Sequence, residues 1–117
     1  MTDPVVLSAG TMTGDKVKNP KGENLGDIQE IMIDLDGGRV AYAVLSFGGV
    51  LGMGDKLFAI PWEALTLDSE DHAFVLDVPK EKLEAASGFD KSAWPNFADR
   101  RWGEEIHRHY GYSPYWA

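Results

Sequence analysis

The stretch that decides the fold is GDIQEIMIDLDGGRVAYAVLSF, residues 26–47, in which two apolar runs flank a glycine-containing turn. The turn is DGG, residues 36–38, and glycine tolerates the positive φ angles that tight hairpin turns require. The runs on either side are long enough to be strands and follow each other directly. The sequence therefore predicts an antiparallel β-hairpin at the centre of the chain.

The first strand of this hairpin is irregular. Ile28 is out of phase with the apolar residues that follow it, because a spacing of three breaks the period of two of a strand. A bulge at residues 29–30 would restore the phase, and bulges are the means by which small barrels bend their strands. With such a bulge, we expect four apolar side chains on one face of the strand: Ile28, Ile31, Ile33 and Leu35.

The second strand of the hairpin is apolar on both faces. One face carries Val40, Tyr42 and Val44, and the other carries Ala41, Ala43, Leu45 and Phe47. An antiparallel strand with one side in water normally alternates apolar and polar residues. We therefore expect another part of the protein to cover the outer face of this strand.

Outward from the hairpin, the chain contains four further strand-like segments. They are residues 15–19, 57–62, 65–68 and 72–78. Six short strands at these spacings predict a mainly β fold, a small barrel or compact sandwich, and not βαβ units.

Four glycines precede Lys56 and raise the question of a phosphate-binding loop: Gly48, Gly49, Gly52 and Gly54. A phosphate loop needs Gly-Lys-Ser/Thr at the start of a helix, whereas Lys56 is followed by Leu57 and a strand-like run. The dinucleotide pattern G-x-G-x-x-G is absent as well. We interpret the glycines as a bend between two strands, and we expect no nucleotide or other cofactor there.

The C-terminal third changes to helical patterns. Pro79 at a first helical position and Gly88 as a stop predict a short helix within residues 79–88. A longer helix is predicted from a cap at Asn96 to about Tyr110. Its apolar residues recur at every fourth position as Ala98, Trp102, Ile106 and Tyr110. His107 and His109 point about 200° apart on such a helix, so we expect a solvated helix end and no metal site.

Seven of the 13 aromatic residues lie from Trp94 onward. Each ring offers 150–250 Å² of surface, which is too much apolar area to leave in water. The aromatic segment must therefore dock on something. Two docking partners remain open at this point: the outer face of residues 39–47, and a second copy of the chain. Exchange across a two-fold axis is favoured, because it would also occupy the trailing residues Tyr112, Tyr115 and Trp116.

Composition limits the possible functions. The chain has 117 residues, fits one domain, and carries a formal net charge of −8, which disfavours nucleic-acid binding. It has no cysteine, and its serines lack the context of an activated nucleophile. The first ten residues do not read as a secretory signal, and no apolar run is long enough to span a membrane, so we expect a cytoplasmic protein.

Four features of residues 14–68 occur in the order typical of one family. They are V-x-N-x-x-G-E-x-L-G at 17–26, D-x-x-x-G-R-V-x-Y at 34–42, the glycine bend, and I-P-W-x-x-L at 60–65. This set resembles the PRC-barrel family, named for the cytoplasmic domain of the photosynthetic reaction-centre H subunit and found also at the C-terminus of a ribosome maturation factor. The C-terminal segment resembles extensions of free-standing bacterial members. The resemblance implies a small β-barrel that acts in assembly and has no known catalytic residues.

We therefore predict an N-terminal arm (1–13), a six-stranded PRC-type β-barrel (14–78) and a helical, aromatic-rich extension (79–117). The expected function is that of a non-catalytic adaptor or assembly module that forms a homodimer and binds a further protein. An accessory role in RNA or ribosome assembly is the alternative. A small-molecule binder or enzyme that uses the glycine bend is a weaker one. The residues predicted to make the interactions are Phe47, Gly48, Gly49, Leu51, Trp62, Trp94, Trp102, Ile106, Tyr110 and Trp116.

Overall fold

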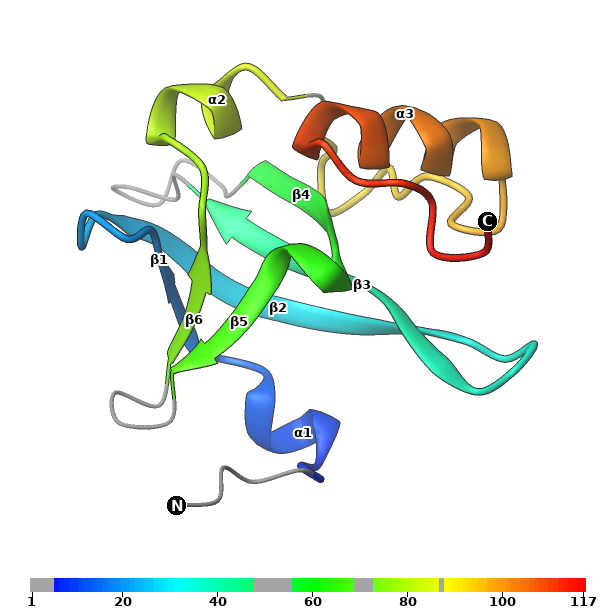
Figure 1. The fold of residues 1–117 in the computed structure, drawn as a ribbon, viewed down its shortest axis with the longest axis horizontal. Coiled ribbons are helices and arrows are strands. Elements are labelled where there is room, and N and C mark those ends of the chain that lie inside the picture. The colour runs from blue at the N-terminus through cyan, green and yellow to red at the C-terminus, as the bar shows by residue number, and fades with distance from the viewer. Residues whose placement is uncertain (1–5, 48–55, 69–72, 87) are drawn as a thin grey trace.

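The computed structural model describes residues 6–47, 56–68, 73–86 and 88–117 (Figure 1). The strands are β1 (Lys16–Lys18), β2 (Asn24–Asp34), β3 (Arg39–Phe47), β4 (Lys56–Pro61), β5 (Leu65–Asp68) and β6 (Ala73–Leu76). The helices are α1 (Ala9–Met12), α2 (Lys80–Glu84) and α3 (Arg100–Tyr110), with a 3₁₀ turn at Trp62–Ala64. The glycine bend, including Gly48, Gly49 and Leu51, lies outside the described residues.

The six strands form one mixed sheet in the order β4-β3-β2-β1-β6-β5. All neighbouring strands are antiparallel except β1 and β6, which are parallel. The sheet is curled, so that in Figure 1 β5 and β6 cross in front of the long β2–β3 hairpin. This confirms the predicted mainly β, six-stranded fold with a helical, aromatic-rich C-terminal extension, and the sheet has the shape of a half-barrel.

The bulge predicted in β2 is present, because the β2–β3 register shifts between Ile28 and Glu30. Ile28 and Ile31 are both buried, as expected. Ile33 and Leu35, which were expected on the same face, are 47% and 89% exposed, so this apolar face is buried only as far as Ile31. A second register shift lies between Met32 and Ile33, and here the extra residue is Ala41 of β3.

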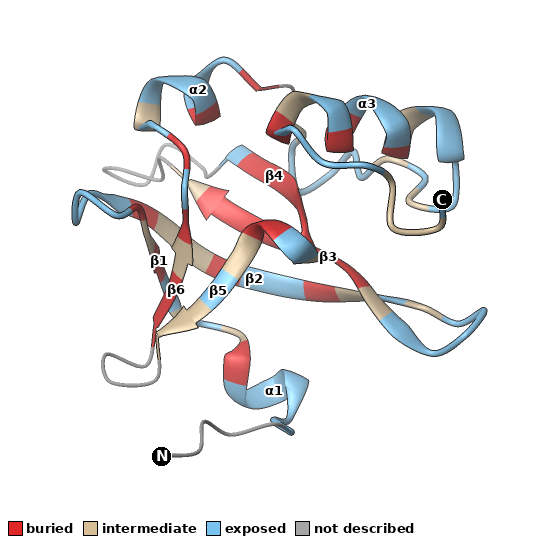
Figure 2. Cartoon of the chain, viewed as in Figure 1, coloured by how far each residue is buried: buried red, intermediate tan, exposed pale blue. Residues whose placement is uncertain are grey.

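The core lies between the curled sheet and the helices, as the buried segments in Figure 2 show. Leu25 of β2, Phe58 of β4 and Leu76 of β6 are almost completely buried, as is Leu83 of α2. One continuous apolar cluster includes these residues together with Ile106 and Tyr110 of α3. The extension therefore shares the core of the sheet.

The outer face of β3 is covered by the C-terminal extension of the same chain. Tyr42 and Val44 on this face are 1% and 0% exposed. The segment before α3 is tied to the sheet edge by two backbone hydrogen bonds between Leu57 and Phe89, of 2.9 and 2.8 Å. The expectation that the outer face of β3 is covered is thus confirmed.

The start of α3 differs from its prediction. The N-cap is Asp99, whose carboxylate accepts hydrogen bonds from the backbone N–H groups of Arg101 and Trp102. Asn96, the predicted cap, instead accepts from the N–H of Ala98 in a turn that precedes the helix. Both residue types cap well, so the sequence offered two competing start sites. The end of the helix is as expected, with Gly111 at φ 82° in the left-handed conformation.

Candidate functional site

Tyr42, on the outer face of β3, lies at the centre of a group of aromatic rings. The ring centroids of Phe97, Trp102, His107 and Tyr115 lie 5.7, 5.5, 5.4 and 6.0 Å from that of Tyr42. Edge-to-face contacts at these distances stabilise aromatic pairs beyond the effect of their buried area. We call these five residues, together with Trp116, the Tyr42 cluster. It joins β3 to the segment before α3, to α3 itself and to the C-terminal tail.

Gly103 allows α3 to approach this cluster closely. A Cβ atom at this position would lie 2.6 Å from the hydroxyl oxygen of Tyr42 and 2.7 Å from Cη2 of Trp116. Both distances are far below van der Waals contact. Glycine is therefore required here for close approach between a helix and two aromatic side chains.

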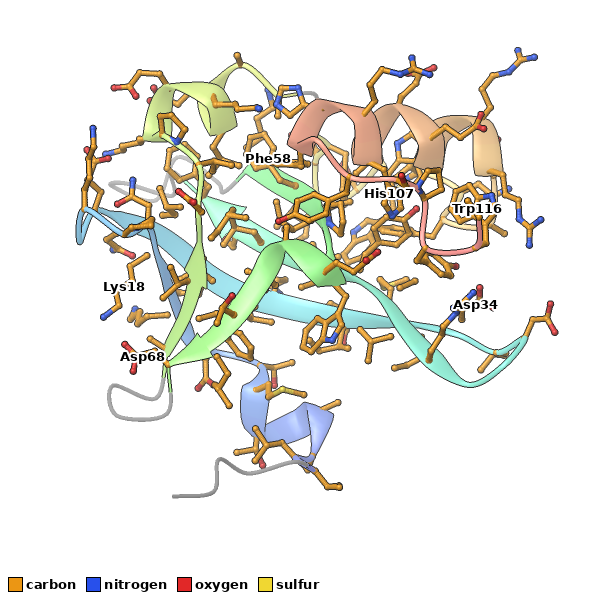
Figure 3. The ribbon with its side chains drawn as sticks, viewed as in Figure 1. Lys18, Asp34, Phe58, Asp68, His107 and Trp116 are labelled. Atoms are coloured by element: carbon orange, nitrogen blue, oxygen red, sulfur yellow. The ribbon has the colours of Figure 1, made fainter. Side chains whose placement is uncertain are left out.

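His107 of α3 lies on the buried side of the helix, next to Trp116 (Figure 3). It is 0% exposed, so the prediction that it belongs to a solvated helix end is wrong. Its Nδ1 lies 2.7 Å from the carbonyl oxygen of Gly103. Because a carbonyl can only accept, the proton of the ring is on Nδ1. Among the described residues, Nε2 of His107 and the hydroxyl of Tyr42 are buried without a hydrogen-bond partner.

A hydrogen bond fastens the C-terminal tail to the β2–β3 hairpin. The hydroxyl of Tyr115 donates to Oδ2 of Asp34, and the guanidinium of Arg39 lies 4.7 Å from the centre of the Tyr115 ring. This hydrogen bond lowers the pKa of Asp34, and the backbone N–H of Asp36 adds to the effect. Burial, followed by the bond to Asp34, raises the pKa of Tyr115 to about 12. The bond therefore favours a charged carboxylate and a neutral phenol.

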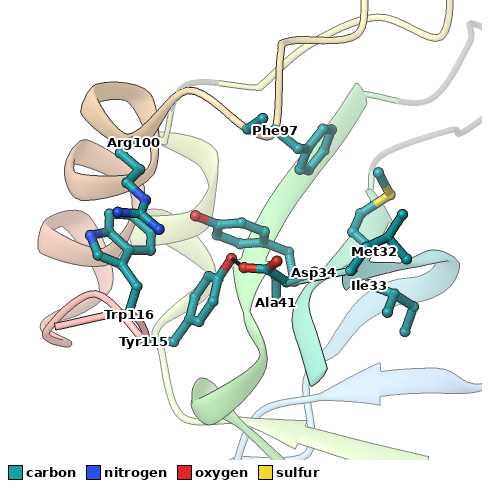
Figure 4. A pocket seen from close by; sticks show the side chains of 11 residues that line it. Met32, Ile33, Asp34, Ala41, Phe97, Arg100, Tyr115 and Trp116 are labelled. Atoms are coloured by element: carbon teal, nitrogen blue, oxygen red, sulfur yellow. Dashed lines mark hydrogen bonds between the residues drawn. The ribbon is translucent and has the colours of Figure 1, made fainter. Parts of the chain in front are cut away.

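A groove of about 370 Å³ lies between this hairpin and the extension (Figure 4). Its walls come from the end of β2, from the segment before α3 and from the tail. Arg100 stands at its rim, with its guanidinium 5.3 Å from the centre of the Trp116 ring. The apolar residues that line the groove include Met32, Ile33, Leu35, Phe97 and Trp116.

A second, wider groove of about 680 Å³ lies on the other side of the tail. Val40 of β3 and Trp62 of the 3₁₀ turn line one side of it, and Tyr112 and Pro114 line it from the tail. Tyr112 is 39% exposed. Both grooves are thus shaped by the tail, and each is lined by polar and apolar surface in similar amounts.

The predicted interaction residues fall into separate places. Trp102 and Trp116 belong to the Tyr42 cluster, and Trp94 reaches it through Phe97, at 6.0 Å between ring centroids. Ile106 and Tyr110 are buried in the core. Phe47 packs on Phe58 and Trp62 packs on Phe74, both away from the cluster.

Sequence reasoning missed Gly103, His107 and the bond between Asp34 and Tyr115. A signal for the first two exists. The buried residues of α3 are Gly103, Ile106, His107 and Tyr110, which is the i, i+3, i+4, i+7 pattern of a buried helix face. The prediction instead followed the apolar residues at every fourth position from Ala98, and this series does not contain Gly103 or His107. No local signal pairs Asp34 with Tyr115, because they are 81 residues apart.

The model of the PRC-barrel domain family matches residues 4–83 of the chain. The match covers more than half of the sequence, and its extent agrees with the curled sheet together with α1 and most of α2. The chain therefore belongs to the PRC-barrel domain family. No curated protein matches the chain.

Two further properties concern only the residues that the structure describes. Within these ranges, no group of three or more His, Asp and Glu side chains is arranged to hold a metal ion. No helix among them is both long enough and apolar enough to cross a bilayer.

Replacement of Gly103 by alanine tests the close approach at the Tyr42 cluster. Alanine has the higher helix propensity, by about 1 kcal/mol, yet we expect Gly103→Ala to lower the free energy of unfolding by about 1–3 kcal/mol through overpacking. The control is Gly10→Ala in α1, where the nearest atom to the new Cβ would be 3.7 Å away. Urea unfolding should show no loss of stability for this control. Equal behaviour of the two variants would contradict the packing described here.

The pH dependence of stability tests the bond between Tyr115 and Asp34. The pKa of Asp34 is lowered in the folded state from its ordinary value of 3.8. The carboxylate therefore stabilises the fold above about pH 4, and this stabilisation is lost as the pH falls through the folded-state pKa. We expect Asp34→Asn to lower the melting temperature at pH 7, with the difference from the wild type shrinking below pH 4. Asp77→Asn, at an exposed aspartate elsewhere in the chain, should show no such pattern. A difference that is the same at pH 7 and pH 3 would be the contrary result.

Proposed function

We propose that this PRC-barrel protein is a non-catalytic protein–protein adaptor or assembly module that self-associates. The observation that carries this proposal is the apolar surface at the end of the β2–β3 hairpin. There, Ile33 and Leu35 are exposed beside a groove lined by Met32, Phe97 and Trp116. An exposed apolar patch next to a concave surface is typical of protein interaction sites.

The arrangement of the potentially reactive side chains supports a role other than catalysis. Tyr42 and His107 adjoin each other, a pairing that could serve acid–base chemistry in an open cleft. Tyr42 is buried beneath α3 and His107 lies on the inner side of that helix, so the Tyr42 hydroxyl and Nε2 of His107 are both buried. Burial also raises the pKa of Tyr42, which keeps its hydroxyl protonated and unreactive. Tyr42 and His107 therefore act as packing residues within the Tyr42 cluster.

The site of self-association differs from the one that the aromatic tail suggested. The tail packs on Tyr42 of its own chain, which leaves less aromatic surface for exchange between two copies. Tyr112 and Trp94 remain 39% exposed and are available to a partner. The proposal therefore needs no exchange of the tail.

Two measurements on the purified protein test the proposed function. Sedimentation velocity over a wide concentration range should show a dimer that dissociates on dilution, because exposed apolar surface favours association. A gel-shift experiment with ribosomal RNA fragments at ~0.15 M salt should show no retardation, because an acidic protein gains little from counterion release. A strict monomer that retards RNA in a salt-sensitive manner would reject the adaptor and favour the RNA-assembly alternative.

A further inference from the structure

We propose that the end of the β2–β3 hairpin and the 370 Å³ groove beside it form a self-complementary surface, on which two copies of the chain pair about a two-fold axis. This inference rests on the self-association proposed above and assigns it to a particular surface. Leu35 and Ile33 of each copy would enter the groove of the other copy. We call Ile33, Leu35 and Asp36 the hairpin tip.

The hairpin tip is held in a fixed conformation. The backbone N–H of Asp36 donates to Oδ1 of Asp34 at 2.9 Å, which closes a local turn. Gly37 and Gly38 follow with φ of 100° and 65°, as tight hairpin turns require. Leu35 is therefore presented to solvent, 89% exposed, on a pre-organised turn. Burial of such a residue in a partner costs little conformational entropy.

The groove is suited to receive apolar side chains. Phe97 and Trp116 supply aromatic surface on the side of the extension, and Met32 supplies a thioether on the side of the sheet. The bond between Tyr115 and Asp34 and the packing of Trp116 on His107 hold the walls in place. The groove is thus formed within a single chain, before any partner binds.

The relative position of these two features favours a second copy as the occupant. Ile33 and Leu35 both protrude and line the groove, so the knob and the hole lie side by side on one surface. A two-fold axis between such features places each knob over the hole of the other copy. In such a pair the contact between the hairpin tip and the groove forms twice, which doubles the buried apolar area. Both contacts use the same surface of the protein.

The charges around the groove also favour a second copy. The protein carries a net charge of −8, so two copies repel each other unless the surfaces in contact are locally balanced. Here the exposed Asp36 and the bonded Asp34 are accompanied by two guanidiniums, Arg39 over Tyr115 and Arg100 over Trp116. Two-fold pairing would bring Asp36 of one copy toward Arg100 of the other. The contact would then be attractive despite the acidic net charge.

Substitution at Leu35 tests the apolar part of this surface. Because Leu35 is exposed in the single chain, Leu35→Glu should leave the melting temperature and the circular dichroism of a dilute sample unchanged. It should weaken dimerisation in sedimentation velocity by about tenfold or more, as expected for a leucine buried at an interface. The control is Leu7→Glu, which makes the same change at another exposed leucine, outside the groove.

Charge reversal tests the polar part. Asp36→Lys would face Arg100 of the partner and should weaken the dimer, whereas Asp77→Lys, the same reversal at an exposed site outside the groove, should not. Combining Asp36→Lys with Arg100→Glu should restore dimerisation, because the pairing is reversed on both sides. Restoration would be difficult to explain unless the two residues meet across the interface.

The outcomes separate this surface from the proposed function. A wild-type dimer that Leu35→Glu dissociates supports the surface. A wild-type dimer that Leu35→Glu and Asp36→Lys leave intact overturns the surface but not self-association. A wild-type protein that stays monomeric at all concentrations overturns both. A monomer that captures a different protein from lysate, and loses it on Leu35→Glu, overturns the second copy as occupant and assigns the groove to that protein.

Discussion

The burial of Tyr42 is the constraint on which the rest of the structure depends. A tyrosine on the outer face of β3 would leave a large ring in water, at a cost of roughly 25 cal/mol per Å² of apolar surface. The extension removes this surface from water with four rings from three segments, and Gly103 lets α3 approach closely enough to do so. The hydroxyl of Tyr42 finds no partner among the described residues, so packing and not a hydrogen bond of its own holds Tyr42 in the cluster.

The same packing determines which surface is left for partners. Once the extension lies on β3, its aromatic side chains are largely used within the chain, and the end of the hairpin projects past it. The tail then forms one wall of each groove and is fixed by Tyr115 to Asp34. In this family member, the extension both completes the core and shapes the candidate binding surface. A binding surface built this way is already formed before any partner arrives.

The sequence predicted the fold well and the site only in part. The hairpin, the bulge at residues 29–30 and the covered outer face of β3 follow from local periodicity, because register and burial act over a few residues. The exposure of Ile33 and Leu35 does not follow, since it depends on which distant parts of the folded chain cover the hairpin. The buried His107 was predictable from the spacing of Gly103, Ile106, His107 and Tyr110. The bond between Tyr115 and Asp34 was not, because only the folded chain brings these residues together.

A double-mutant cycle between Tyr42 and Trp102 tests most directly whether the extension docks on β3. The free energies of unfolding would be measured in urea for the wild type, Tyr42→Leu, Trp102→Leu and the double variant. The ring centroids of Tyr42 and Trp102 are 5.5 Å apart, so we predict a coupling energy of about 0.5–1.5 kcal/mol between the two side chains. A parallel cycle between Tyr42 and Leu7, an exposed residue before α1 that lies outside the Tyr42 cluster, should be additive. Additive effects of Tyr42 and Trp102 would contradict the account, because the two rings would then not meet in the folded protein.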